Sequence, residues 1–394
     1  MLSLREFWRR HRRKILIAAG VFGSGYFFYK LYNAHKISLA DLERQLADER
    51  EHEELVKAQM QAHFESIQRI ADTTTLPHAM NYLSGRIAEE LDLSQLTERL
   101  MKGKGQPNTL TSSEKLELWD RLKILSFTRL AVSLWAMTML SLYIRTQVNI
   151  LGRHLYIDTA RGLGSSHLLE DVDLIERDDQ QKFLASSDFL ANYGMPVLIS
   201  NIQAAATEVL KGKQLRDVFT TTTLHETVVQ ILDLFMSRGS PHQWAEYMMP
   251  EDARLYKLSE GSSSGKTITI TDTTKFEQLM AEARAVLSSS YRIGEIYFFK
   301  LKMAIFIHCS AEFGSVVEIS LKVIVDALVA DMGAESSGGS LASGMPLARL
   351  LSRVAQMGPL LFDEPNRNRF IQILRNVSEV ELFFTLLYAN MPTS

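Results

Sequence analysis

Residues 111–151 read TSSEKLELWDRLKILSFTRLAVSLWAMTMLSLYIRTQVNIL, and this stretch decides the fold. Thr111 and Glu114 have the spacing of a capping box, in which two side chains satisfy free backbone N–H groups at a helix start. Residues 130–144 are apolar, with an arginine on each side. These fifteen residues fall short of the roughly 18 that indicate a membrane span. We therefore expect one helix over 115–151, with 130–144 buried at the centre of the protein.

Apolar residues also recur at helical spacing in the sequence before and after this segment. Hydrophobic residues make up 46% of the 394 residues, so the chain can bury a large core. Further helices are expected at 77–101, 178–211, 224–237, 275–310, 315–332, 345–357 and 366–390. The run 267–271 alternates like a strand but has no partner strand. Polar stretches near 102–112, 259–267 and 333–344 predict flexible loops. The predicted fold class is all-α, a large and elongated helical bundle.

The amino-terminal residues have the pattern of a single transmembrane anchor helix. Residues 1–14 form a basic segment that we interpret as a targeting signal, with its charge on Arg9, Arg10, Arg12, Arg13 and Lys14. Residues 15–32, apolar apart from Lys30, would span about 27 Å as a helix, close to the ~30 Å hydrocarbon core. The side chains expected in the bilayer include Ile15, Leu16, Ile17, Val21, Phe22, Phe27 and Phe28. A cleaved signal peptide is one alternative, because Gly23-Ser24-Gly25 resembles a cleavage site. A buried core helix is a weaker one, because the adjacent basic residues would be hard to solvate there.

The orientation of the anchor stays open at this point. The positive-inside rule would hold 1–14 in the cytosol and move the remaining chain across the membrane. The single cysteine, Cys309, instead indicates a reducing compartment. Beyond the anchor, 33–62 are dense in charge and predict a solvated stalk helix, which we expect the segment 73–77 to end. Residues 63–394 then form the bundle.

No catalytic constellation is visible, and we predict a protein that is not an enzyme and that holds no metal or cofactor. The run GSSSGKT at 261–267 is one residue short of a phosphate-binding loop and precedes a strand-like run instead of a helix. It also matches G-x-S-x-G, but without the flanking strand and helix. His225-Glu226 lacks the second histidine of a zinc motif, because position 229 is valine. The net charge of −3 gives no reason to expect nucleic acid as a partner.

Trp119 lies near the start of the expected central helix, among charged neighbours. Leu116, Trp119 and Leu122 are spaced i, i+3 and i+6, so they share one helix face. A tryptophan in this setting can anchor the apolar side chains of a partner. An ordinary core tryptophan is the alternative, and the residues alone leave both interpretations open.

Five segments together resemble the peroxin-3 family. KLELWDRLKILSFTR at 115–129 is similar to the most recognisable part of that family. Four more agree in order: HFESIQR at 63–69, RTQVNILGRHLYID at 145–158, YMMPED at 247–252 and MPLARLL at 345–351. The resemblance covers most of the chain and fits a plant-type member, with a loop at 102–113 that is longer than in animal relatives.

The resemblance implies a docking receptor in the peroxisomal membrane, with the bulk of the chain facing the cytosol. This orientation conflicts with the positive-inside expectation. The expected partner is peroxin-19, a soluble chaperone that carries newly made peroxisomal membrane proteins and inserts an amphipathic helix into an apolar groove. The residues that the resemblance assigns to this groove are Trp119, Lys115, Leu116, Leu122, Leu100, Pro346 and Arg349.

Two other classes of function stay open. A structural tether would recruit other organelle factors through the stalk and the loops. A membrane-bound helical enzyme, acting for example on lipid, would need a polar cluster that lines a buried pocket. The position of carboxylates and histidines in the folded chain discriminates between these classes.

Overall fold

The computed structural model describes scattered positions between 36 and 66 and the stretches 68–105, 111–164, 177–251, 275–288, 313–334 and 341–390. The chain divides into two compact units, Met1–His63 and Phe64–Ser394. In the first unit the described positions are helical, and Leu42, Leu46 and Leu55 are largely exposed. The targeting segment 1–14 and the anchor 15–32 lie outside the described residues.

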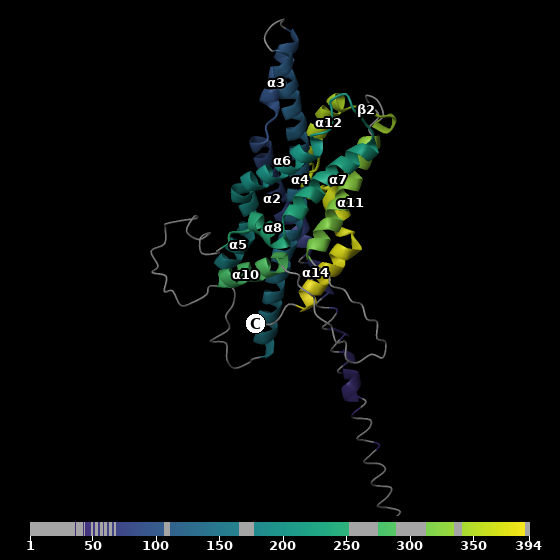
Figure 1. Ribbon diagram of the computed structural model, residues 1–394. Coiled ribbons are helices and arrows are strands. Elements are labelled where there is room, and N and C mark those ends of the chain that lie inside the picture. The colour runs from purple at the N-terminus through teal and green to yellow at the C-terminus, as the bar shows by residue number, and fades with distance from the viewer. Residues whose placement is uncertain are drawn as a thin grey trace, which may run out of the picture. The chain divides into compact units, whose positions relative to one another are not determined.

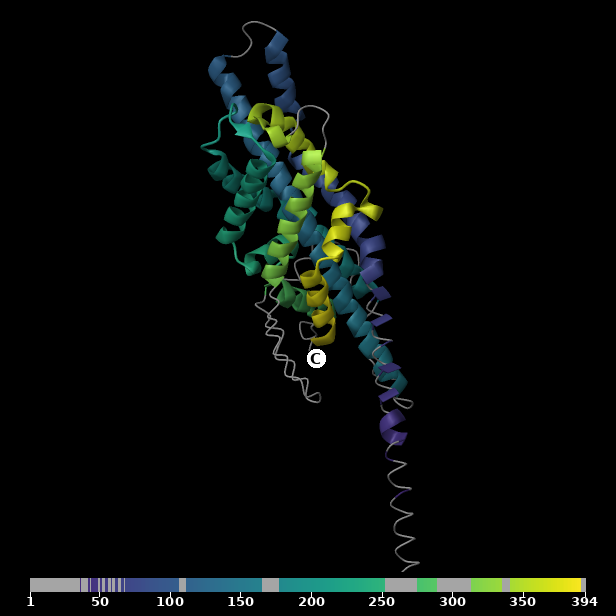
Figure 2. The same cartoon turned by 90° about the vertical axis from the view of Figure 1, so that its right-hand side faces the viewer.

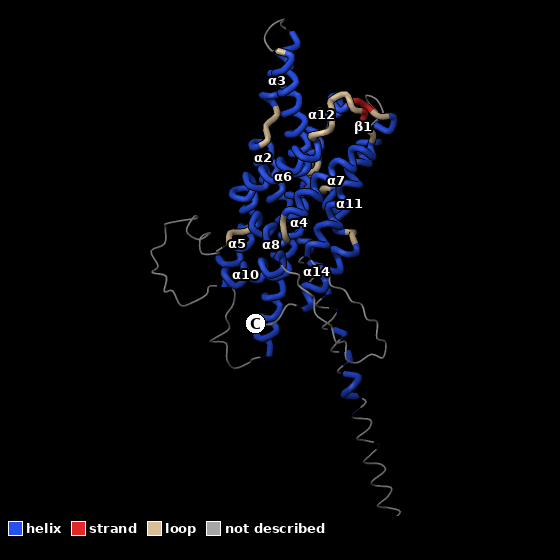
Figure 3. The backbone as a smooth tube through the Cα atoms, viewed as in Figure 1, coloured by secondary structure: helices blue, strands red, loops and turns tan. Residues whose placement is uncertain are grey.

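Helices build the second unit, which confirms the predicted all-α fold (Figures 1 and 3). In chain order its longer elements are α2 (Leu76–Glu90), α3 (Ser94–Gly105), α4 (Ser112–Gly164), α5 (Arg177–Ala185), α6 (Met195–Leu210), α7 (Thr221–Arg238), α8 (Pro241–Met248), α10 (Lys275–Ser288), α11 (Phe313–Ala334), α12 (Leu347–Leu360), α13 (Arg369–Arg375) and α14 (Ser378–Asn390). Two π-helices, η1 (Ala71–Thr75) and η3 (Leu190–Gly194), and the 3-10 turn η2 (Ser186–Asp188) precede α2 and α6. Within the described stretches, the strands β1 (Val218–Phe219) and β2 (Met345–Pro346) form one antiparallel pair.

Helix α4 is the central element, as the sequence predicts. Every residue of 130–144 is buried, including the bulky Trp135 and Tyr143. Helices α2, α6, α10, α11, α12 and α14 all pack against α4 (Figures 1 and 2). Over the described residues Ser112–His154 is long and apolar enough to cross a membrane, but 83% of its most apolar window is buried inside the protein. It therefore serves as the core helix of the bundle.

The arginine that ends this apolar run is buried instead of solvated. Arg145 is 4% exposed, and its guanidinium lies 3.5 Å from the carboxylate of Asp72 in η1. The same guanidinium lies 5.5 Å from the centre of the Phe384 ring in α14. Separating Arg145 from Asp72 would leave a buried charge without a partner, so the ion pair holds η1 against α4. The contact with Phe384 joins α14 to the same arginine.

Two helix boundaries around η1 and α2 differ from prediction. The expected helix 77–101 is wrong, because Leu91 leaves helical geometry with φ −115° and ψ 51°. The Asp92 carboxylate then accepts a hydrogen bond of 2.9 Å from the backbone N–H two residues on, which starts α3. The segment 73–77 does not end the preceding helix either. It continues as η1 into the first turn of α2, where Pro77 needs no N–H partner.

Other predicted ranges also change in the folded chain. The predicted bounds of the loop near 102–112 are wrong at both ends, since α3 continues through Gly105 and α4 begins at Ser112. The predicted start of the loop near 333–344 is wrong, because α11 runs to Ala334. The expected helix 178–211 is interrupted by η2 and η3, and 366–390 is interrupted between α13 and α14. The predicted loop 259–267, the strand-like run 267–271 and positions 289–310 lie outside the described residues.

Candidate functional site

The predicted capping box fixes the start of α4 and is confirmed. The Glu114 carboxylate accepts a hydrogen bond of 2.7 Å from the backbone N–H of Thr111, and the Thr111 hydroxyl accepts one of 3.2 Å from the Glu114 N–H. The pKa of the Glu114 carboxyl is lowered, first by the Thr111 N–H and then by the Thr111 hydroxyl. The reciprocal bonds hold the first turn, so the residues that follow are presented on a defined helix.

The candidate face of α4 runs from solvent into the core. Leu116 is 65% exposed and Leu122 is 8% exposed, while Trp119 between them is half-buried. Lys115, next to Leu116, is exposed. The indole of Trp119 is therefore neither sealed in the core nor free on the surface, which leaves part of it open to contact. Leu122 lies in the core.

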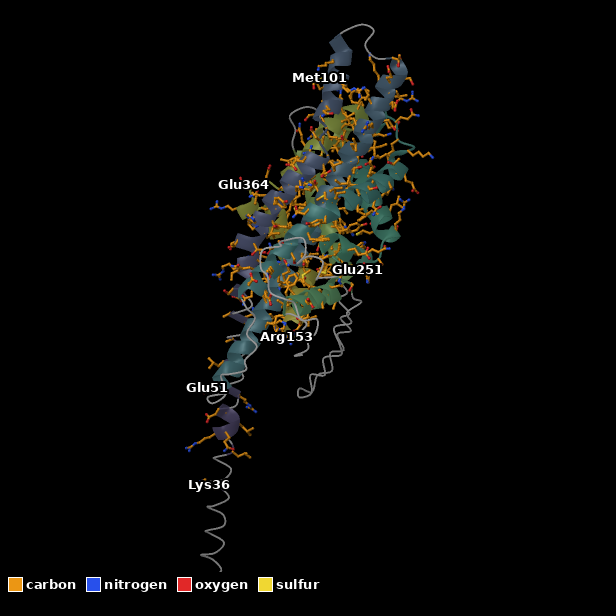
Figure 4. All side chains as sticks on the ribbon, turned by 90° about the vertical axis from the view of Figure 1, so that its left-hand side faces the viewer. Lys36, Glu51, Met101, Arg153, Glu251 and Glu364 are labelled. Carbon is orange, nitrogen blue, oxygen red and sulfur yellow. The ribbon has the colours of Figure 1, made fainter. Side chains whose placement is uncertain are left out.

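Helix α3 carries the predicted Leu100 and a second apolar residue, Met101, that the sequence analysis missed. Leu100 is half-buried in the last turns of α3, and its neighbour Met101 is 66% exposed. Figure 4 shows Met101 near the end of α3, and α3 packs along α4. The available signal was the unbranched apolar side chain one residue after Leu100, in a helix whose other residues are mostly polar.

The second predicted segment lies at the start of α12. Pro346 and Arg349 are both exposed, and Pro346 pairs across the ladder with Val218, which is 63% exposed. Val218 is a further apolar residue that the sequence analysis missed, because its neighbour in space comes from a segment 128 positions later. Gly344 has φ +83°, and a Cβ there would lie 2.6 Å from Val218 Cγ1, so only glycine fits this turn.

A buried lysine ties α4 to the loop that follows α6. Lys123 is 4% exposed, and its ammonium donates to the carbonyl oxygens of Leu210 at 3.2 Å and Lys213 at 2.9 Å. The ammonium also lies 2.7 Å from the carboxylate of Asp120. Because the last carbonyls of a helix have no partner within it, Lys123 serves as a cap for α6. Lys123 follows Trp119 by one helical turn.

The same loop holds the first turn of α12. The carbonyl oxygens of Leu215 and Asp217 accept hydrogen bonds of 2.9 Å from the N–H groups of Ala348 and Leu347. These bonds satisfy two of the free N–H groups at the start of α12. The loop 211–217 thus connects Lys123 on one side to the segment of Pro346 and Arg349 on the other.

An aromatic contact adds to this connection. Phe219 of β1 is 1% exposed and packs against Phe127 of α4, with ring centres 6.5 Å apart and planes inclined by 54°. The ammonium of Lys213 lies 5.6 Å from the centre of the Phe219 ring. The strand pair is therefore fixed on α4 by a buried ring, two turns beyond Trp119.

The start of α4, the end of α3, the strand pair and the start of α12 lie at one end of the second unit (Figures 1 and 2). This end offers exposed apolar side chains on rigid elements, with lysine and arginine side chains beside them. Such an arrangement can bind an apolar surface. A separate cavity of about 460 Å³ lies between η3, α6, α7 and α8, and none of the sequence-predicted site residues lines it.

Metal chemistry has no visible basis in the described part of the chain. No group of three or more histidine, cysteine, aspartate or glutamate side chains is placed to hold a metal ion among the residues that the structure describes. His225, considered above for a zinc motif, instead lies with Nε2 2.6 Å from the carboxylate of Asp326 and links α7 to α11. The phosphate-loop-like run 261–267 lies outside the described residues.

Comparison with known proteins identifies the family. The chain matches the Peroxin-3 family over residues 6–114 and 104–390. Peroxisome biogenesis protein 3-2 of Arabidopsis thaliana is 57% identical over 390 residues, which cover 99% of each chain, and protein 3-1 of the same plant is equally similar. Peroxisomal biogenesis factor 3 of Homo sapiens is 29% identical over 297 residues, which cover 73% of this chain and 72% of the human one. The chain therefore belongs to the peroxin-3 family of peroxisome biogenesis factors.

Proposed function

We propose that this chain is a docking receptor of the peroxisomal membrane that binds peroxin-19 and so receives newly made membrane proteins. The observation that carries the proposal is the graded face of α4, where the exposed Leu116, the half-buried Trp119 and the buried Leu122 succeed one another. An amphipathic helix laid on this face would cover the open part of the indole. The activity needs no chemistry, which agrees with relatives named as biogenesis factors.

The rigid support of this face favours tight docking. Capping bonds fix the first turn of α4, and Lys123 fixes the next turns to the neighbouring loop. A partner that binds pre-ordered side chains loses less conformational entropy than one that must order them. The ammonium of Lys115 and the guanidinium of Arg349 can meet polar groups at the border of the docked helix, with their aliphatic stems on its apolar face.

The membrane part of the proposal rests on the sequence. Residues 15–32 anchor the chain in the peroxisomal membrane as a single span, and the second unit faces the cytosol where a soluble chaperone can reach it. Fluorescent-tag imaging of the chain with and without residues 1–36 tests this assignment. Loss of the peroxisomal pattern on deletion is expected, and an unchanged pattern would refute the anchor.

The binding site is tested by calorimetry with the full chain in lipid nanodiscs and purified peroxin-19. Trp119→Ala is expected to reduce the binding free energy by at least about 2 kcal/mol, as for tryptophans that dominate interfaces. Leu116→Ala should weaken binding less, because a leucine side chain offers a partner less apolar contact area than a tryptophan does. Leu382→Ala is the matched control, since it truncates a leucine that is 42% exposed on α14. Unchanged affinity for Trp119→Ala, with an intact fold, would remove the site from this face.

A further inference from the structure

The cavity of about 460 Å³ is a second feature that can bind a ligand. Its walls come from η3, α6, the end of α7 and α8. Its lining combines aromatic rings (Phe189, Tyr193, Phe235, Trp244 and Tyr247) with polar and charged side chains (Asn201, Arg238, Gln243 and Glu246). Cavities that hold drug-sized ligands measure roughly 300–1,000 Å³. The space is larger than one side chain needs, so it can take a bulky group together with part of the chain that carries it.

The backbone around this cavity is specialised. Residues Leu190–Gly194 form the π-helix η3, and π-helices in proteins often occur at functional sites. Directly after Tyr193, a Cβ on Gly194 would collide with the carbonyl oxygen of Tyr247. Glycine therefore permits η3 to approach α8 closely, while Tyr193 stays 53% exposed beside the cavity.

The aromatic walls are held from beneath by a buried ring. Trp135 of α4 is fully buried, and it contacts Phe235 and Tyr247 edge-on, with ring centres 5.6 Å apart in each pair and planes inclined by 89° and 86°. Edge-to-face pairs of this kind stabilise the orientation of both rings. The walls are thus pre-ordered, and a further aromatic ring could extend the same packing.

An apolar collar forms the rim of the cavity. Tyr193 of η3 and Val197 of α6 are four residues apart in sequence and are 53% and 56% exposed. Asn201 and Ala204 continue the same face and also line the cavity. A small molecule inside the cavity would leave this collar in water, whereas a polypeptide segment lying along α6 would cover both. The collar therefore favours a polypeptide.

The charges at the mouth indicate the character of that segment. The guanidinium of Arg238 is paired with the carboxylate of Glu208. The exposed carboxylate of Glu246 lies 3.7 Å from His242, a contact that neutralises it only when the imidazole is protonated. The nearby Tyr247 hydroxyl stays neutral, because burial raises the pKa of the phenol. The remaining charge at the mouth is negative and complements a basic residue.

We propose that this cavity is a second docking site of the bundle, which takes a partner polypeptide segment with a bulky aromatic side chain and a lysine or arginine on the same face. The aromatic side chain enters the cavity and packs against the aromatic residues that line it, and the basic residue meets Glu246. The site is separate from the face of Trp119, so it does not depend on binding of peroxin-19.

A peptide selection tests the proposal with the full chain in lipid nanodiscs. A phage library of random 12-residue peptides is selected on the native chain, with depletion on empty nanodiscs and on the Ala204→Trp chain. Ala204 is exposed and helical, so tryptophan there fills the cavity mouth without entering the core. Gln203→Trp, at the preceding exposed position, is the matched control because residue 203 does not line the cavity. Equal thermal unfolding midpoints show that both variants fold.

The expected result is a set of peptides with an aromatic residue near a lysine or arginine. Their affinity should fall at least tenfold with Ala204→Trp and at least threefold with Glu246→Gln, and stay unchanged with Gln203→Trp and Trp119→Ala. No enriched peptide, or peptides insensitive to Ala204→Trp, would overturn the proposal. Native mass spectrometry that finds a bound lipid on the native chain and none on the Ala204→Trp chain, without enriched peptides, would assign the cavity to lipid and overturn the docking proposal as well.

Discussion

Replacing Lys123 with methionine is expected to loosen the Trp119 face without removing any residue from it. Lys123 is buried in α4, and its ammonium donates to the carbonyl oxygens of Leu210 and Lys213. Methionine keeps most of the apolar volume of the side chain and removes the donors. The carbonyl oxygen of Lys213 then loses this donor, and the carbonyl oxygen of Leu210 keeps only the backbone N–H of Lys213.

The size of the effect follows from these contacts. A hydrogen bond from a charged donor contributes about 1.5–3 kcal/mol, and Lys123 makes two to carbonyl oxygens. The contact with Asp120, whose side chain is 57% exposed, adds only about 0–1 kcal/mol because solvent screens it. Release of the desolvation cost of the ammonium offsets part of the loss. We expect a net destabilisation of about 3 kcal/mol, centred on the loop 211–217.

Hydrogen exchange read by mass spectrometry measures this effect locally. The amides of Leu347 and Ala348 donate to the loop, so their protection should fall with it. About 3 kcal/mol corresponds to a roughly hundredfold faster exchange, since each 1.4 kcal/mol is a factor of ten. Lys115→Met is the control, because it removes an exposed lysine from the same helix. If Lys123→Met and Lys115→Met gave the same exchange at the start of α12, the coupling through the loop would be refuted.

Three further predictions concern helices α12, α2 and α4. Gly358→Ala should destabilise the chain by about 1–3 kcal/mol, because its Cβ would lie 2.9 Å from Ser133 Oγ where α12 crosses α4. Gly85→Ala, with nothing within 4 Å of the new Cβ, should stabilise α2 by about 0.5–1 kcal/mol. The urea concentration at half unfolding, measured for both variants and the native chain, tests the two predictions. The pKa of Glu114 is lowered in the folded state, so its contribution is present above the unfolded pKa and is lost as the pH falls through the folded pKa. Exchange at the first turn of α4 should therefore rise in acid below the ordinary glutamate range, and Glu114→Gln should remove that pH dependence.

The sequence was sufficient for the features that depend on local pattern. The buried centre of α4 follows from an uninterrupted apolar run, and the capping box follows from a spacing of three residues. The family also followed from the order of short segments, which the comparisons confirm. Boundaries were less accurate where a single residue decides them. Leu91 ends α2 without a glycine or proline beside it, so no helix-breaking residue marked the end of α2.

Features that join distant segments required the tertiary structure. Lys123 reads as one more surface charge, and only the fold brings the end of α6 to it and buries it. Val218 and Pro346 are neighbours through a ladder whose strands are too short to give a periodic signal. The cavity likewise depends on the approach of η3 to α8 at Gly194. Local sequence determines which helices form, because capping and periodicity act within a few residues, whereas burial and partnership depend on contacts between residues far apart in the chain.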